Sequence, residues 1–136
     1  MEHIKQFFTQ DHYARLSGIE LLSVEPGRAV ARMPIEPHHL NAVGIVHGGA
    51  IFTLADLAFA AASNARGSVA VAINASITYL KAVSSGTLRA EARELSANPK
   101  LASYTMDVTD DRGELVAVVQ GLVYRKGQPL PWAAKE

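Results

Sequence analysis

A single carboxylate, Asp56, interrupts a stretch of sequence that is otherwise almost entirely apolar. Between Ala50 and Ala62 only Thr53 and Asp56 are polar, so a helix formed by this segment must be buried on nearly every side. Burying a carboxylate is costly unless the group is paired or neutralised. Asp56 therefore either bonds to a nearby strand or helix end or carries chemistry, and this segment alone supports both interpretations.

Two glycines mark the expected start of this helix. Gly48 and Gly49 have no side chains to block an approach to the free backbone N–H groups at the positive end of the helix. The arrangement is typical of an oxyanion site, although it is also ordinary turn chemistry. His47 could donate a hydrogen bond as a neutral imidazole or cap the helix. Asn41 could hold a water or cap the loop.

The spacing of these groups predicts a second subunit. Gly49 and Asp56 are seven residues apart, which puts them on one helix face but separates them by roughly 10 Å along the axis. Acyl transfer needs its oxyanion donors and its attacking or proton-accepting group about 3 Å from the same reacting atoms. Two such helices packed antiparallel across a two-fold axis would bring Asp56 of one chain to Gly49 of the other. We therefore predict a composite site at a dimer interface.

Other kinds of site lack their signatures. His38 and His39 look like a metal pair but have no third ligand at zinc spacing and no H-E-x-x-H motif, so we predict no metal. The sequence contains no cysteine, no G-x-S-x-G elbow, no Walker loop and no G-x-G-x-x-G. A serine hydrolase or a nucleotide-cofactor enzyme is therefore not expected.

Composition narrows the partners and the location. The chain has 13 Lys and Arg against 13 Asp and Glu, so no basic field exists to hold a nucleic acid. Residues 42–63 are about as long and apolar as a membrane helix, but His47 and Asp56 fall inside them and we predict no span. The N-terminus lacks the apolar block of a signal peptide and cysteine is absent, which favours the cytoplasm.

The elements that must position these residues point to one α+β domain over residues 1–136. We expect a short amphipathic N-terminal helix at about 3–16 and a core at about 19–125. Pro34 in the first hairpin predicts an edge strand or a bulge. After the central helix, a four-stranded antiparallel meander is expected. The picture is a curved sheet of five or six strands wrapped round one buried helix. The segments expected to form strands are 29–36, 69–80, 87–96, 101–109 and 114–125.

One family carries this pattern. Asn41, followed by His47-Gly48-Gly49-Ala50, Leu54-Ala55-Asp56 and the strand ending Tyr79-Leu80-Lys81, resembles the hotdog-fold acyl-CoA thioesterases of the phenylacetic acid degradation type. The resemblance covers about residues 24–124. It implies hydrolysis of acyl-CoA thioesters, with aromatic acyl groups such as phenylacetyl or hydroxyphenylacetyl favoured. It also implies dimers that pair into tetramers and a reaction without metal or cofactor, coenzyme A being part of the substrate.

The resemblance also implies roles for individual residues. Asp56 looks like the catalytic carboxylate, as base or nucleophile, and Gly48 or Gly49 like the oxyanion donor. By the same comparison His47 is the orienting residue and Asn41 positions water. The pantetheine arm would run near Asn74, Ala75 and Ser76, and the CoA phosphates would meet Lys81 and also Arg66 or Lys100.

Two departures from the family pattern leave details open. Some relatives have Thr or Ser directly after the catalytic Asp, where this chain has Leu57, and many have Arg-Pro in place of Lys81-Ala82. Three alternatives to a thioesterase also stay open. The domain could be a non-catalytic acyl-CoA sensor, another CoA-thioester enzyme on the same fold such as an enoyl-CoA hydratase, or a structural dimer in which Asp56 only satisfies a helix end.

Overall fold

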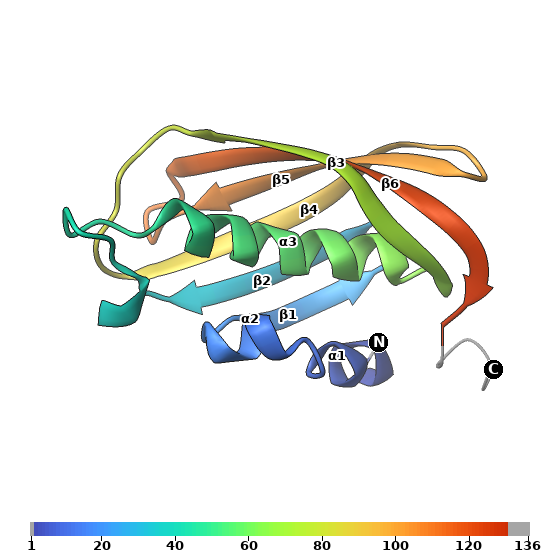
Figure 1. Cartoon of the computed structure of the whole chain (residues 1–136), viewed down its shortest axis with the longest axis horizontal. Helices are drawn as coiled ribbons and strands as arrows, with labels where there is room; N and C mark the ends of the chain where they lie inside the picture. The colour runs from blue at the N-terminus through green and yellow to red at the C-terminus, as the bar shows by residue number, and fades with distance from the viewer. Residues whose placement is uncertain (1, 131–136) are drawn as a thin grey trace.

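The computed structural model describes residues 2–130, so Met1 and residues 131–136 of the predicted single domain lie outside it. Six antiparallel strands form one curved sheet, and helix α3 (Gly48–Asn64) lies across its concave face (Figure 1). This confirms the predicted α+β class and the central helix. The strands are β1 (Glu20–Glu25), β2 (Arg28–Pro34), β4 (Thr87–Ala97), β5 (Leu101–Thr109), β6 (Leu115–Pro129) and β3 (Ser68–Tyr79), in spatial order.

The apolar side chains of α3 form the centre of the core. Leu54, Ala58 and Phe59 are fully buried against the sheet. The Phe59 ring lies so close to β6 that a Cβ on Gly121 would be 2.5 Å from it, so this position has room only for glycine. The prediction that this helix is buried on nearly every side is wrong for one of its faces, because the curved sheet covers only part of its circumference. That open face carries Gly49, which is exposed, and Phe52, Thr53, Asp56 and Ala60, which are half-buried.

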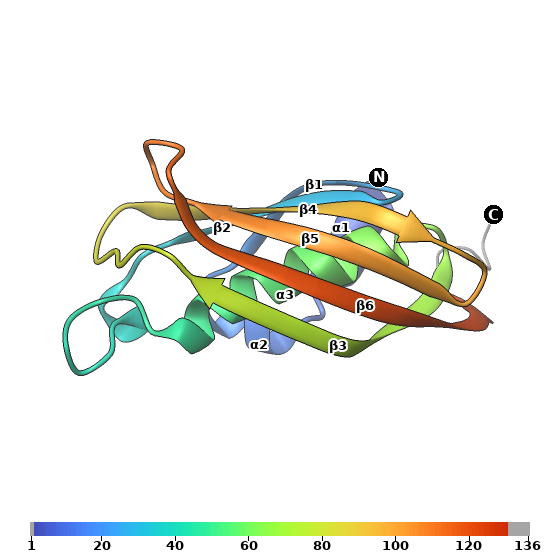
Figure 2. The same ribbon diagram turned by 90° about the horizontal axis from the view of Figure 1, so that it is seen from above.

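The predicted four-stranded meander is wrong at its first strand. β3 pairs with β6 and not with β4, which instead pairs with β2 and β5. Residues 80–86 carry the chain past the start of α3, where the Val46 N–H donates to the Val83 carbonyl. The carbonyl of their last residue, Gly86, accepts from the Ile35 N–H, and this bond places the start of β4 beside the end of β2. β3 is therefore an edge strand, as Figure 2 shows.

Pro34 does not mark an edge strand. β2 lies inside the sheet between β1 and β4, and Pro34 is its last residue, opposite Thr87. A proline at a strand end removes one donor without breaking the ladder. The bulge in this hairpin is in β1, between Leu21 and Ser23. At the other end of the chain β6 extends past the expected limit of the core at residue 125, to Pro129.

The N-terminal segment forms two short helices rather than the single one expected over 3–16. α1 (Glu2–Phe8) and α2 (His12–Leu16) are separated by a turn, and the Asp11 side chain caps α2 by accepting from the Ala14 N–H at 3.1 Å. A cap at this position starts a new helix because it satisfies a free N–H group. α1 lies beside β1 (Figure 1), and α2 contacts α3. Within residues 2–130 no helix is long and apolar enough to cross a membrane.

Candidate active site

The first turn of α3 has one backbone donor left over. The Gly49 N–H donates to Nδ1 of His47 at 2.8 Å, and the N–H groups of Ala50 and Ile51 donate to the His47 carbonyl. Of the first four N–H groups of the helix, only that of Gly48 has no acceptor among residues 2–130. An oxyanion donor must be free to bind its ligand, and of the two glycines only Gly48 meets this requirement among the described residues.

The same contact determines which nitrogen of His47 carries the proton. A backbone N–H can only donate, so Nδ1 is the acceptor and the proton of the neutral ring is on Nε2. His47 thus caps the helix and keeps an Nε2–H donor on an exposed side chain. Capping and orientation, which compete as interpretations of the sequence, are compatible because they use different ring nitrogens.

Asn41 is held by its oxygen and presents its amide nitrogen. Its Oδ1 accepts from the N–H groups of Val43 at 3.0 Å and Ile45 at 3.3 Å, so the side chain caps the loop before α3. These two donors also identify which end of the amide is oxygen. What Asn41 can offer a ligand is therefore a pair of N–H donors, which suits a carbonyl oxygen or an oxyanion as well as a water.

A cavity of about 390 Å³ lies at this end of the helix and brings several predicted residues together. Asn41, Gly48 and Lys81 line it, with Tyr79 and a set of apolar side chains. The Tyr79 hydroxyl donates to the Gly48 carbonyl at 3.0 Å. A Cβ on Gly48 would lie 2.8 Å from that hydroxyl oxygen, so the glycine here makes room for the tyrosine as well as for a ligand.

Asp56 is not part of this group within one chain. It is eight residues after Gly48 in the same helix, about 12 Å further along the axis at about 1.5 Å per residue. The carboxylate lies on the open face, half-buried. Burial raises its pKa above the ordinary 3.8, and the charge of Asp11 raises it further. A carboxylate with a raised pKa is a better proton acceptor than an ordinary aspartate.

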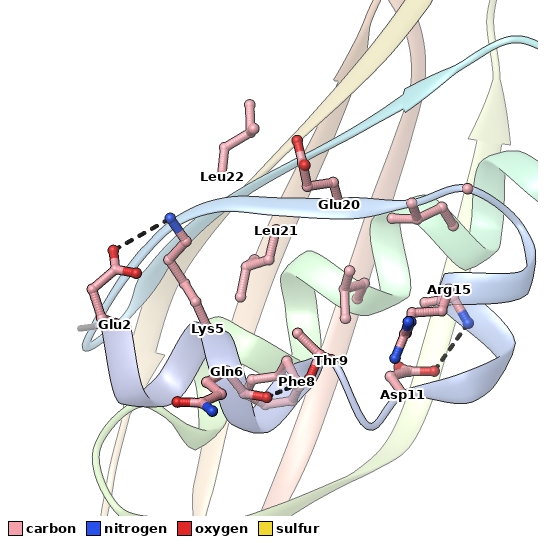
Figure 3. Close-up of a pocket in the computed structure, with 14 residues that line it drawn as sticks. Glu2, Lys5, Gln6, Phe8, Thr9, Asp11, Arg15, Glu20, Leu21 and Leu22 are labelled. Carbon is pink, nitrogen blue, oxygen red and sulfur yellow. Dashed lines mark hydrogen bonds and ion pairs between the residues drawn. The ribbon is translucent and has the colours of Figure 1, made fainter.

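A larger pocket of about 920 Å³ separates the N-terminal helices from β1 and the flank of α3 (Figure 3). Leu57, which follows Asp56, lines it together with Asp11. The rim carries the ion pair of Lys5 with Glu2 at 3.5 Å, and apolar side chains including Phe8 line the interior. The pocket therefore lies close to Asp56, between α3 and the N-terminal helices.

The expected phosphate ligand Lys81 is engaged elsewhere. Its ammonium group lies 2.6 Å from Oδ2 of Asp110 and 2.9 Å from Oε2 of Glu114. The hydrogen bonds to these carboxylates raise the pKa of Lys81, and its ammonium group lowers the pKa of Asp110. Lys81 borders the cavity beside Gly48, but its charge is already balanced.

The other two basic residues lie at the far end of the molecule. Arg66 follows the last turn of α3 and forms an ion pair with Glu94 at 2.6 Å. Lys100 is exposed in the turn between β4 and β5, with no ion pair among the described residues. Neither can reach a ligand at Gly48 of the same chain, because the whole of α3 lies between.

The predicted pantetheine contacts lie on the edge strand. Asn74, Ala75 and Ser76 are exposed in β3, paired with β6 on one side only. Asn74 and Ser76 border a shallow hollow of about 340 Å³ that also contains Gln120. The alternation of a strand turns Ala75 to the opposite face, toward α3.

His39 of the histidine pair has a structural role. His39 is buried, its Nδ1 accepts from the Glu36 N–H at 2.9 Å, and its Nε2 lies 2.6 Å from the Ser17 carbonyl oxygen. Both ring nitrogens therefore bind backbone groups. No group of three His, Cys, Asp or Glu residues that could hold a metal ion occurs in residues 2–130.

Two residues near the site had no role in the sequence interpretation. Tyr79 was named only as part of the family motif at the end of a strand. No feature of the neighbouring sequence indicates that its ring covers Gly48, 31 residues earlier in the chain. Asp11 carries a recognisable helix-cap signal, but its proximity to Asp56 depends on how the N-terminal helices pack.

Comparison with known proteins identifies the family pattern. Residues 43–117 match the family model described as the thioesterase superfamily. A protein of Archaeoglobus fulgidus that carries an esterase name is 41% identical, over 96% of this chain and 86% of its own length. Acyl-coenzyme A thioesterase PaaI of Escherichia coli is 33% identical, over 88% of this chain and 86% of its own length.

Solved structures agree with the sequence relatives. The Escherichia coli PaaI protein from the phenylacetic acid degradation operon superposes with a TM-score of 0.87 at 31% identity, covering 91% of both chains. The TT0310 protein of Thermus thermophilus superposes with a TM-score of 0.81 at 36% identity, covering 85% of this chain and 97% of that one.

Proposed function

The chain belongs to the thioesterase superfamily and is an acyl-CoA thioesterase of the hotdog fold, and we propose that it hydrolyses aromatic acyl-CoA esters at a site shared by two subunits. The observation that carries the proposal is the unpaired Gly48 N–H, beside the amide of Asn41 at the start of α3. Donors collected at a helix start can stabilise the oxyanion that develops when a thioester carbonyl is attacked.

The proposed reaction uses these donors and one carboxylate. The thioester oxygen would accept from the Gly48 N–H, with Nε2–H of His47 or the Asn41 amide as a second donor. Asp56 takes a proton from water as the water oxygen bonds to the carbonyl carbon, whose π electrons move to the oxygen. Collapse of the tetrahedral intermediate breaks the C–S bond, and the proton on Asp56 passes to the leaving thiolate. The products are the free acid and coenzyme A.

A second copy of the chain completes the proposed site. Asp56 and Gly48 of one chain are too far apart for one carbonyl, whereas antiparallel packing of two α3 helices would bring Asp56 of the partner subunit to Gly48. The open face of α3 and the edge strand β3, with Ile73 54% exposed, support such a dimer. Sedimentation would separate a monomer from this dimer and from the predicted dimer of dimers.

The aromatic acyl group is proposed from the relatives. Two of the similar proteins carry phenylacetic acid degradation in their names. In the partner's absence the 390 Å³ cavity is open on one side, so its final shape depends on residues from both chains. We expect phenylacetyl-CoA and hydroxyphenylacetyl-CoA to exceed straight-chain acyl-CoAs in kcat/KM.

Release of free thiol from a panel of aromatic and aliphatic acyl-CoAs tests the activity and the acyl group together. Asp56→Asn should keep the fold and lose most turnover. Asp107→Asn should behave as wild type, because Asp107 is a partly exposed aspartate of β5 that pairs with Arg93. Full activity of Asp56→Asn would refute the catalytic assignment. A flat profile across the panel would refute the aromatic preference but not the hydrolysis.

The role of Asp56 as base or nucleophile needs a separate experiment. A nucleophilic carboxylate attacks the thioester to give an anhydride, and water then opens the anhydride. In a single turnover in heavy-oxygen water, the nucleophilic route leaves label in the Asp56 side chain. The general-base route leaves label only in the released acid. Mass spectrometry of the peptide containing Asp56 decides between the two.

A further inference from the structure

The hydroxyl of Tyr79 is the starting point of a continuous hydrogen-bonded chain at the active site. Tyr79 is the last residue of β3, its side chain is 51% exposed, and its hydroxyl donates to the Gly48 carbonyl at 3.0 Å. That carbonyl belongs to the same peptide group as the Gly49 N–H. The Gly49 N–H in turn donates to Nδ1 of His47 at 2.8 Å.

We propose that Tyr79 is a positioning residue that acts on the thioester through the Gly48–Gly49 peptide and His47. The inference rests on the proposed function, and it assigns the tyrosine no contact with the reacting atoms. The chain runs from the Tyr79 O–H to the Gly48 carbonyl, from the Gly49 N–H to Nδ1, and ends at the Nε2–H of His47.

Hydrogen bonds in series polarise one another. A donor placed on a peptide oxygen draws electron density from the peptide nitrogen, which makes its N–H a stronger donor. A stronger bond to Nδ1 holds the proton of the imidazole on Nε2 and fixes the plane of the ring. Tyr79 thereby favours the tautomer of His47 that can donate to a substrate carbonyl.

The contact also holds the glycine turn in place mechanically. The Tyr79 ring lies against Gly48 so closely that a Cβ there would be 2.9 Å from Cζ. β3 and the start of α3 are joined at this point, and the free N–H of Gly48 belongs to the residue that is pinned. Removal of the hydroxyl alone separates the two effects, because the ring and its packing remain.

The test is Tyr79→Phe, with Tyr124→Phe as the matched control. Tyr124 is a partly exposed tyrosine of β6, 39% exposed, and no side-chain hydrogen bond is found for it within residues 2–130. Loss of one neutral hydrogen bond should lower kcat by about fivefold to tenfold, with KM nearly unchanged. The control should keep wild-type kcat. Wild-type kcat in Tyr79→Phe would overturn the proposal.

The background of His47→Ala distinguishes action through His47 from an independent role. If Tyr79 acts through the imidazole, Tyr79→Phe should change kcat less than twofold in that background, by the logic of a double-mutant cycle. An equal fold-change in both backgrounds would mean that Tyr79 contributes by packing or by touching substrate, and would overturn the proposal.

A readout that needs no turnover keeps this inference separate from the proposed function. NMR of labelled ring nitrogens should show His47 with an unprotonated Nδ1 and a protonated Nε2 in the wild type. In Tyr79→Phe the two nitrogens should move toward an averaged tautomer, and in Tyr124→Phe they should not. Unchanged nitrogen signals in Tyr79→Phe would overturn the role of the tyrosine. Absence of thiol release by the wild type would refute the thioesterase proposal alone.

Discussion

The two ends of α3 differ in how their backbone polar groups are hydrogen-bonded. At the C-terminal end, three of the last four carbonyls accept from outside the helix: Ala62 from the Gly27 N–H, Ser63 from the Arg125 guanidinium, and Asn64 from the Gly67 N–H. At the N-terminal end, the Gly48 N–H has no acceptor among the described residues, and the side chain at that position is a hydrogen atom. Buried and exposed ends of one helix thus differ in how completely their polar groups are paired.

The closed end contains a small network of charges. Arg125, only 9% exposed, lies 3.8 Å from Glu94 and donates to the Tyr104 hydroxyl at 3.3 Å. Tyr104 in turn donates to Glu94 at 3.0 Å, and its burial raises its pKa to about 12. The comparison predicts that the closed end contributes mainly to the free energy of unfolding and that the open end contributes mainly to catalysis. Substitutions at each end should therefore affect different measurements.

The largest expected effect is at the closed end. Arg125→Met should lower the free energy of unfolding by about 3 kcal/mol, because it breaks the largely buried ion pair with Glu94 and leaves the Ser63 carbonyl without its donor. Urea unfolding checks this value. Arg28→Met, which removes an exposed ion pair, should cost less than about 1 kcal/mol. A large loss of kcat in folded Arg125→Met would break the separation of roles.

The next effect is at the open end and concerns rate. Gly48→Ala should lower kcat by about 100-fold, since its Cβ would collide with the Tyr79 ring and displace the oxyanion donor. The melting temperature should change little. Gly48→Ala with Tyr79→Ala removes the collision and should recover part of the lost rate. No recovery would mean that the added methyl blocks the ligand directly.

A smaller stability effect sharpens the comparison within the closed end. Asn64 donates to the carbonyls of Ala60 and Ala70 and accepts from the Ala70 N–H at 2.9 Å, which ties α3 to β3. Asn64→Ala should cost about 1–2 kcal/mol of unfolding free energy. Asn98→Ala, in an exposed turn, should cost less. Equal losses of unfolding free energy in the two variants would show that the buried hydrogen bonds of Asn64 stabilise the protein no more than exposed ones.

The smallest expected effect on stability comes from Asp56, between the two ends. Its pKa is raised by burial, so folding favours the protonated form and ionisation lowers stability as the pH rises above 3.8. Asp56→Asn should therefore gain about 0.5–1 kcal/mol at neutral pH, a gain typical of removing a functional group. The gain should disappear below the ordinary pKa, where the aspartate is protonated in both states. Thermal unfolding over an acid-to-neutral pH series tests the sign, and a constant difference would contradict it.

Local pattern accounts for much that was predicted correctly. The apolar run around Asp56 predicts the central helix, and period-two alternation predicts the strands, because both signals depend on residues a few positions apart. The prediction of a four-stranded meander was wrong because strand order depends on pairing between segments that are distant in the sequence. The turn signal at Ser84-Ser85-Gly86 shows that the chain turns there but not which strand it meets next.

The sequence alone determined the residues of the candidate site: a glycine pair before an apolar helix and a carboxylate two turns later. It also determined the family to which that spacing belongs. Only the tertiary structure decided which distant side chains contact the residues around this site. It placed Tyr79 on Gly48, 31 residues away, and joined Lys81 to Asp110 and Glu114, 29 and 33 residues away. The physical reason is that hydrogen bonds and ion pairs act over a few ångströms of space, and sequence separation does not report which distant side chains folding brings within that range.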